Sequence, residues 1–262
     1  MNSMKNTKSP RRYYLDNIRW ITVILVVVYH TLMMYSGITP LGTVAEPGTI
    51  HIQDSIQYFL YPWFMMILFL VSGISARISL TNYPDNKAFL KKRTVRYLVP
   101  STLGLLAFQW VQGYVSMKLS HSFDTIPDTV PKPVQFLIMS LSGTGVLWYL
   151  QTLWIFSLVL VLIRKLTKNQ EKLYPKTVNF PFWGMLLLAV PAVGFAQILN
   201  TPVIVSYRFG IYGFAFFAGY YIFAHEEVID RLTKYCIPLM IVSVLMGIAL
   251  TVLFWGQNFA DA

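Results

Sequence analysis

The chain of 262 residues is 55% hydrophobic and only 12% charged, and its formal net charge at pH 7 is +10. Because soluble domains carry about 25% charged residues, this composition excludes an ordinary soluble fold. The basic excess does not indicate a nucleic-acid partner either, because most Lys and Arg residues lie in the N-terminal segment and in every second loop between the apolar segments.

Long apolar blocks follow one another along the chain, and a helix that crosses a bilayer needs about 20 such residues. The blocks cover residues 18–36, 56–76, 97–116, 146–163, 182–199, 209–223 and 237–255. Lipid offers backbone groups no hydrogen-bond partners, and the blocks lack the alternation of polar and apolar residues that barrel strands show. The sequence therefore predicts an all-α, polytopic transmembrane bundle of about seven spans, which forms a single domain over residues 1–262.

The loops differ strongly in their basic content. Of the 21 Lys and Arg residues, all but Lys118, Lys132 and Arg208 fall in the N-terminal segment or in the second, fourth and sixth loops. Such a concentration of basic residues on one side is the positive-inside pattern. It predicts a multi-pass protein of the cell membrane, surrounded by membrane lipid, with its N-terminus in the cytoplasm.

The first apolar block contains a histidine, His30, directly after the run from Trp20 to Tyr29. An ionisable group at membrane depth is costly, which makes it a candidate for function. At about 100° per residue, Asp16, Arg19 and His30 fall within an arc of roughly 60° on one helical face. His30 lies about 18 Å along the axis from Ile18, past the middle of a hydrocarbon core of about 30 Å and towards its outer side.

Two interpretations of His30 remain open at this point. A neutral imidazole can take a proton from an attacking hydroxyl, which is the work of a general base. Alternatively, His30 is hydrogen-bonded to a neighbouring helix and holds the bundle together. The polar stripe with Asp16 and Arg19 favours the first interpretation, because three such groups need a polar cavity.

A basic segment, Lys91-Lys92-Arg93-Thr94-Val95-Arg96, precedes the third block. Arg93 and Arg96 are three residues apart, so on a helix they are expected to face the same way. Two guanidinium groups on one face can hold a phosphate or pyrophosphate. The alternative is that the segment anchors the protein to anionic lipid, as basic juxtamembrane clusters often do.

Small residues mark two places of close packing. The segment Val71-Ser72-Gly73-Ile74-Ser75-Ala76-Arg77 ends the second block and predicts that another backbone or a ligand approaches closely, with Arg77 as a further guanidinium. Glycines at positions 210, 213 and 219 predict close helix packing in the sixth block.

The remaining histidines, His51, His121 and His225, fall in predicted loops and are expected to be solvated. The sequence has no His-Glu-x-x-His metal motif, no Gly-rich phosphate loop and no Ser nucleophile elbow. It therefore predicts no metal site and no permanently bound cofactor.

Together these segments resemble acyltransferase family 3, a family of integral membrane O-acyltransferases, over residues 13 to about 155. The resemblance rests on Tyr14-Leu15-Asp16-x-x-Arg19 leading to Tyr29-His30, on Phe69-Leu70-Val71-Ser72-Gly73, on Phe89-Leu90 followed by Arg93-x-x-Arg96 and Pro100, and on Leu147-Trp148-Tyr149-Leu150. The block from Trp63 to Leu80 and the Tyr-His pair are most similar to the branch that modifies periplasmic glucans.

The resemblance implies a reaction and a set of roles. An acyl group, acetyl or succinyl, would pass from cytoplasmic acyl-CoA, a co-substrate, to a hydroxyl of an extracytoplasmic glycan or lipid-linked carbohydrate. It implies a catalytic group of His30, as the base, with Asp16. It also implies an acyl-CoA-binding group made up of Arg93 and Arg96, which would hold the phosphates, together with Arg19 and Arg77.

Two departures from the family pattern leave alternatives open. Family members commonly carry a His before the Leu-Trp pair, where this chain has Val146, and they commonly have about ten spans. We therefore expect either a truncated or shortened member, or a bundle that an oligomer or a partner subunit completes. The alternative function is a catalytically degenerate or non-enzymatic multi-span protein, such as a transporter subunit. The sequence lacks the paired half-helices expected of a transporter.

Overall fold

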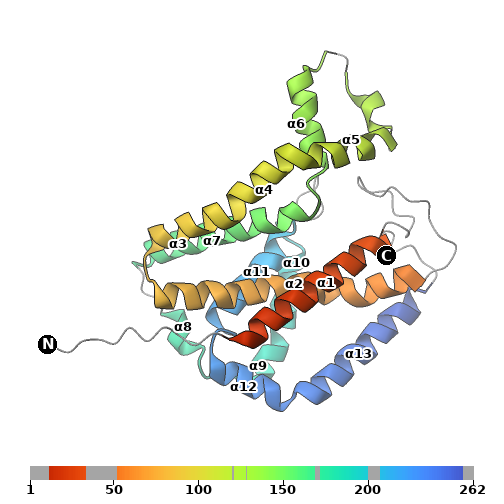
Figure 1. The fold of residues 1–262 in the computed structure, drawn as a ribbon. Coiled ribbons are helices and arrows are strands. Elements are labelled where there is room, and N and C mark those ends of the chain that lie inside the picture. The colour runs from red at the N-terminus through yellow and green to blue at the C-terminus, as the bar shows by residue number, and fades with distance from the viewer. Residues whose placement is uncertain are drawn as a thin grey trace. The chain divides into compact units, whose positions relative to one another are not determined.

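The computed structural model describes residues 12–33, 52–119, 121–127, 129–168, 172–199 and 207–255, and its elements in these ranges are helices, as predicted (Figure 1). The chain divides into two compact units. The first comprises Met1–Val23, Met65–Lys92 and Phe156–Tyr235, and the second comprises Ile24–Phe64, Arg93–Ile155 and Cys236–Ala262. The long helices α1 (Tyr13–Met33), α2 (Ile52–Asn82) and α7 (Trp148–Leu166) each contribute to both units.

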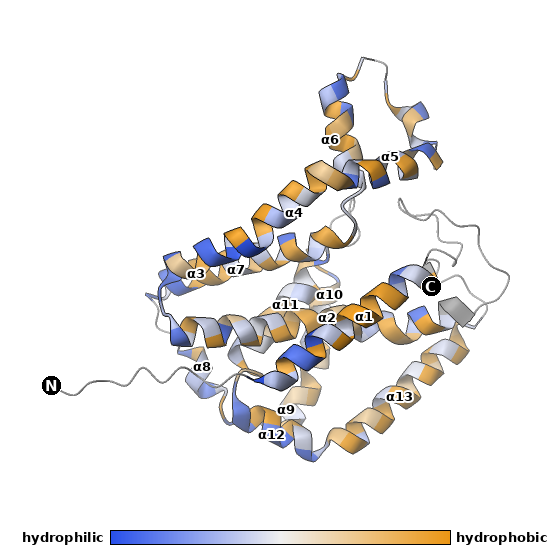
Figure 2. Cartoon of the chain, viewed as in Figure 1, coloured by the Kyte–Doolittle hydropathy of each residue, from blue (hydrophilic) through white to orange (hydrophobic). Residues whose placement is uncertain are grey.

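Four helical stretches of the described chain are long and apolar enough to cross a membrane. They are Tyr13–Leu32, Ser55–Asn82, Gly145–Leu166 and Cys236–Leu253, and the last of these is α13. In α2, 56% of the most apolar stretch is buried, whereas in α13 only 6% is buried. Hydrophobic residues predominate in α13 (Figure 2), and many of them are exposed, which would be costly in water and is expected in lipid. These helices support a membrane protein.

The other three predicted spans are helical but interrupted or short, so the count of seven spans is not confirmed. Residues 97–116 belong to a helical run of α3 (Asn86–Arg93), a π-helical turn (Thr94–Leu98), α4 (Val99–Gly104), a second π-helical turn (Leu105–Gln109) and α5 (Trp110–Leu119). Residues 182–199 divide into α9 (Phe182–Leu187) and α10 (Ala189–Ala196). Residues 209–223 contain α11 (Phe209–Tyr221), which has 13 residues.

Prolines account for two of these interruptions. A proline has no N–H for the carbonyl four residues before it, and its ring clashes with that carbonyl. Ahead of Pro100 the helix widens, and the N–H of Val99 donates to the carbonyl of Thr94, five residues back. Pro191 likewise has no N–H to donate to the carbonyl of Leu187, the residue at which α9 ends.

Within the first unit, α2 and α11 approach each other backbone to backbone. A Cβ atom on Gly73 would lie 1.9 Å from the carbonyl oxygen of Phe216, and one on Gly219 would lie 2.1 Å from the carbonyl oxygen of Leu70. Phe216 is fully buried at this contact. The close packing that the sequence predicts around Gly73 and Gly219 is therefore confirmed.

Replacing Gly73 with alanine is expected to lower the thermal unfolding temperature of the purified protein. Atoms of the backbone occupy the space of the new methyl group, so the two helices must separate, at a cost of about 1–3 kcal/mol or more. For a chain of this size that is a decrease of roughly 2–4 °C per kcal/mol. Gly194 in α10 is the matched control, because a Cβ there meets nothing within 4 Å. Equal unfolding temperatures of the two alanine variants would contradict the close contact.

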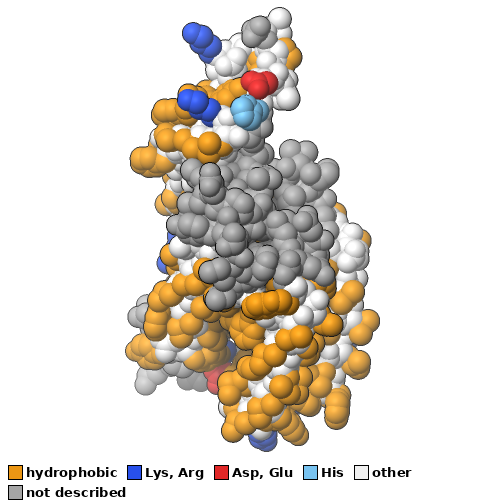
Figure 3. Space-filling model, turned by 90° about the vertical axis from the view of Figure 1, so that its right-hand side faces the viewer, with side chains coloured by type: hydrophobic (Ala, Val, Ile, Leu, Met, Phe, Trp, Pro, Cys, Tyr) orange, Lys and Arg blue, Asp and Glu red, His pale blue; other side chains and the backbone are white. Residues whose placement is uncertain are grey.

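Within the second unit, α5 packs closely against α6 (Lys132–Ser142). A Cβ atom on Gly113 would lie 1.7 Å from the carbonyl oxygen of Met139, and one on Gly143 would lie 2.0 Å from that of Gln109. Among the described side chains on the face drawn in Figure 3, many are hydrophobic. Small residues thus bring helices together inside a unit, while large apolar residues remain on the surface.

Candidate active site

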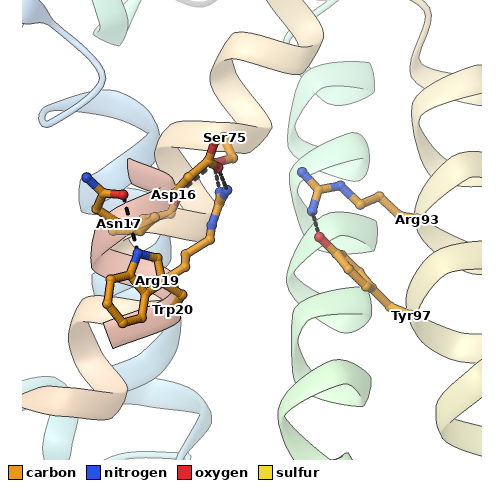
Figure 4. Close-up of polar contacts among 8 residues, drawn as sticks. Asp16, Asn17, Arg19, Trp20, Ser75, Arg93 and Tyr97 are labelled. Atoms are coloured by element: carbon orange, nitrogen blue, oxygen red, sulfur yellow. Dashed lines mark hydrogen bonds and ion pairs between the residues drawn. The ribbon is translucent and has the colours of Figure 1, made fainter. Parts of the chain in front are cut away.

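The polar residues at the start of α1 hold that helix against α2 (Figure 4). Arg19 Nη1 donates to Asp16 Oδ1 at 3.3 Å, and Arg19 Nη2 donates to the hydroxyl of Ser75 on α2. Asp16 and Arg19 are 38% and 37% exposed. Ser75 in turn donates to the carbonyl of Val71 at 2.8 Å. The segment of small residues in α2 is thus in contact with the guanidinium group of Arg19 as well as with the backbone of α11.

Arg77, one of the predicted acyl-CoA ligands, lies among tyrosines of the first unit. Its guanidinium carbon is 3.5 Å from the ring centroid of Tyr174, which belongs to α8 (Leu173–Lys176), as expected of a cation–π contact. Arg77 Nη1 also donates to the hydroxyl of Tyr220 at 3.5 Å. Arg164 Nη1 donates to the same hydroxyl at 3.1 Å, and Arg164 Nε donates to Asn86 Oδ1 at 2.7 Å.

The sequence missed Arg164 and Tyr220 as members of this cluster. Arg164 counted as one more basic loop residue, yet its side chain is only 6% exposed, and Tyr220 is fully buried. A buried guanidinium group needs several acceptors, and a tyrosine hydroxyl at the end of an apolar helix can be one of them. The position of Arg164 directly after the fourth apolar block was the available signal.

His225 is a correction to the sequence prediction, which placed it in solvent. It is 6% exposed, and its ring stacks on Tyr174 at a centroid distance of 3.9 Å. Its Nε2 atom lies 2.9 Å from the carbonyl oxygen of Tyr174 and 3.1 Å from the hydroxyl oxygen of Thr177. His225 is buried because it precedes α12 (Glu226–Lys234), and that turn packs on α8. His121 is exposed as predicted, and His51 lies outside the described residues.

In the second unit, Arg93 and Arg96 differ in their surroundings. Arg93 is 8% exposed, donates to the hydroxyl of Tyr97, and lies 5.0 Å from the centroid of that ring (Figure 4). Arg96 is exposed. The π-helical turn Thr94–Leu98 begins directly after Arg93, so residues three apart no longer follow the α-helical spacing. The expectation that both arginines face the same way assumed a regular α-helix, which this segment is not.

His30 lies in the last turn of α1, and its side chain is exposed. The ring of the preceding residue, Tyr29, is buried and meets the His30 ring edge-on at a centroid distance of 5.4 Å. Tyr29 also packs on Tyr61 and Phe64 of α2, at centroid distances of 5.9 and 5.0 Å. The imidazole is therefore carried by a well-packed aromatic cluster while remaining accessible.

The predicted site residues fall into both units. Asp16, Arg19 and Arg77 belong to the first unit, and His30, Arg93 and Arg96 belong to the second. Asp16 and Arg19 contact each other, and Arg77 makes its own cluster with Arg164 and tyrosines. In the part of the chain that the structure describes, no three His, Cys, Asp or Glu side chains group together as metal ligands.

These observations define a helical membrane protein whose apolar helices carry ionisable side chains. A family model described as an acyltransferase domain matches residues 12–261. The chain therefore belongs to acyltransferase family 3 and is a membrane acyltransferase, which confirms the family that the sequence motifs predict. No curated protein and no solved structure matches it.

Proposed function

We propose that this membrane acyltransferase moves an acetyl or succinyl group from cytoplasmic acyl-CoA to a hydroxyl of an extracytoplasmic glycan or lipid-linked carbohydrate, as in the branch that modifies periplasmic glucans. The observation that carries the proposal is the accessible imidazole of His30 near the end of an apolar helix. An ionisable group in an apolar helix that can cross the membrane is costly to keep, and catalysis explains its presence.

His30 acts as the general base in this proposal. Its neutral imidazole takes the proton of the acceptor hydroxyl while the hydroxyl oxygen attacks the thioester carbonyl carbon. A carbon–oxygen bond forms, the carbon–sulfur bond breaks, and the CoA thiolate leaves and takes up a proton. The packing of Tyr29 against Tyr61 and Phe64 supports this role, because it fixes the backbone from which the imidazole projects.

The arginines provide the charge for the acyl donor. Arg96 is exposed and accessible to a phosphate, and Arg93 is held by the Tyr97 hydroxyl beside it. Guanidinium groups bind phosphates through charge-assisted hydrogen bonds, which are about twice as strong as neutral ones. Arg77 and Arg19 are the further donor-binding residues of the proposal, and Asp16 orients Arg19 through their 3.3 Å contact.

The proposal is tested by acyl transfer in membranes that contain the full chain. With acyl-CoA labelled in its acetyl or succinyl group, we expect label to appear on extracytoplasmic carbohydrate, and none in membranes that lack the protein. The two donors, offered at equal concentration, identify the acyl group. Absence of transfer from both donors, in preparations where the protein is folded and binds CoA, would favour the catalytically degenerate alternative.

A further inference from the structure

The first unit contains a groove that the proposed reaction does not use. It lies at the end of α7 and is lined by residues of α7, α8 and α11 and of the turns that follow α7 and precede α8. Its volume is about 850 Å³, which is within the range of sites that hold small molecules. The residues that matter for its chemistry are Ile163, Leu166, Lys168, Lys172, Phe217 and Tyr221.

The α7 side of the groove changes from apolar to basic along the chain. Ile163 and Leu166 belong to the membrane-crossing stretch Gly145–Leu166, whereas Lys168 follows directly after its end. Lys168 has a φ of 50°, the left-handed conformation that often terminates helices. The ammonium group thus follows the point where the apolar stretch stops, which is the depth at which lipid headgroups lie.

The groove is also lined by α11 and by the residues at the start of α8, which again combine apolar and basic side chains. Phe217 and Tyr221 of α11 add aromatic surface, and Lys172, directly before α8, adds a second ammonium group. The hydroxyl of Thr177 donates to the carbonyl of Tyr221, which fixes the end of α11 near α8. Leu166 is 81% exposed and Leu173 is 54% exposed, so apolar side chains continue outward from the groove. The groove therefore offers two positive charges beside an apolar surface.

We propose that this groove binds one anionic phospholipid. The ammonium groups of Lys168 and Lys172 contact its phosphate, and an acyl chain lies along Ile163, Leu166 and Phe217. Basic pockets between membrane helices bind anionic headgroups in this way. The side that carries these lysines is the one that the sequence predicts to be cytoplasmic. The proposal stands independently of the acyl acceptor and donor.

Charge and shape together favour a phospholipid over a soluble phosphate compound. A soluble anion would use the two ammonium groups alone and gain nothing from Leu166 or Phe217. A phospholipid that already lies in the membrane can place an acyl chain against both side chains, so that neither is exposed to water. Its headgroup then meets Lys168 and Lys172 without leaving the interface.

The test is native mass spectrometry of the full chain in mild detergent, with phosphatidylglycerol and phosphatidylcholine of identical acyl chains. We expect one phosphatidylglycerol to bind at least about tenfold more tightly than phosphatidylcholine. Replacing both Lys168 and Lys172 with glutamine should weaken that binding by about tenfold or more. The matched control replaces Lys165 and Lys176 with glutamine, because both are exposed lysines nearby that do not line the groove.

A second variant tests the apolar part of the site without changing charge. Leu173 also lines the groove, so Leu173→Trp should fill part of it and weaken binding of phosphatidylglycerol while the unfolding temperature is kept. The proposal is overturned if both lysine pairs weaken binding equally, or if phosphatidylcholine binds as tightly as phosphatidylglycerol. Displacement of the bound lipid by CoA in the unmodified protein would also overturn it and assign the groove to the acyl donor.

Discussion

Replacing His30 with alanine is expected to lower the rate of acyl transfer by about 10²–10⁴-fold, because the acceptor hydroxyl loses the base that takes its proton. The side chain is exposed, and the aromatic packing below it is made by Tyr29, so the variant should keep its fold. The measurement is the initial rate of label transfer from acyl-CoA at saturating donor, in membranes that hold equal amounts of each variant.

The matched control is His121→Ala. His121 is also an exposed histidine, 83% accessible, and its ring nitrogen lies 3.5 Å from Asp124 in a segment outside the long helices. We expect its loss to leave the transfer rate unchanged. Transfer at the original rate in the His30 variant would remove His30 from the reaction and return it to a role in packing. A lower unfolding temperature that parallels the lower rate would indicate the same.

Replacing Arg96 with alanine is expected to raise the apparent KM for acyl-CoA by about 10–100-fold. A hydrogen bond to a charged group contributes about 1.5–3 kcal/mol. Arg96 is exposed, so the loss of its side chain should leave the packed interior intact. The unfolding temperature should therefore stay the same. Arg93→Ala should raise the KM as well and also lower the unfolding temperature, because Arg93 is buried against Tyr97.

Lys92→Ala is the control for both arginine variants, because Lys92 is an exposed basic residue next to Arg93. If the segment only anchors the protein to anionic lipid, the Lys92 and Arg96 variants will behave alike. A KM that rises in the Arg96 variant alone supports contact with the donor phosphates. The two arginines are then distinguished by stability, since only one of them contributes to the packed interior.

The helical membrane fold could be predicted from the sequence because long apolar blocks have few other ways to satisfy their backbone groups in lipid. The contact at Gly73 and Gly219 could also be predicted, because the absence of a side chain is itself visible in a sequence. In contrast, the π-helical turns around Pro100 depend on how the backbone accommodates a ring, and a regular helical wheel cannot show that. The shared facing of Arg93 and Arg96 therefore stays a prediction, although Arg93 is buried and Arg96 is exposed.

Partners that come from distant parts of the chain could not be predicted. Arg164 and Tyr220 are 56 residues apart, and His225 is 51 residues from Tyr174. Both partnerships depend on which helices pack together inside the first unit. Arg164 was counted only as a basic loop residue, and His225 was expected in solvent because it falls in a predicted loop. A sequence does not distinguish an exposed loop residue from a buried residue at a helix end. The pairing of Asp16 with Arg19 was easier, since the two lie one helical turn apart, whereas the contact of Arg19 with Ser75, 56 residues away, was not predicted.

The backbone contact between α2 and α11 has a consequence for motion. Neither helix can slide past the other without the carbonyl oxygens of Phe216 and Leu70 leaving the space that Gly73 and Gly219 provide. The hydroxyl of Tyr220 of α11 accepts hydrogen bonds from Arg77 of α2 and from Arg164 of α7. These segments of α2, α7 and α11 are therefore expected to move as one rigid body. Whatever rearrangement admits and releases substrates must occur in helices that lack such contacts.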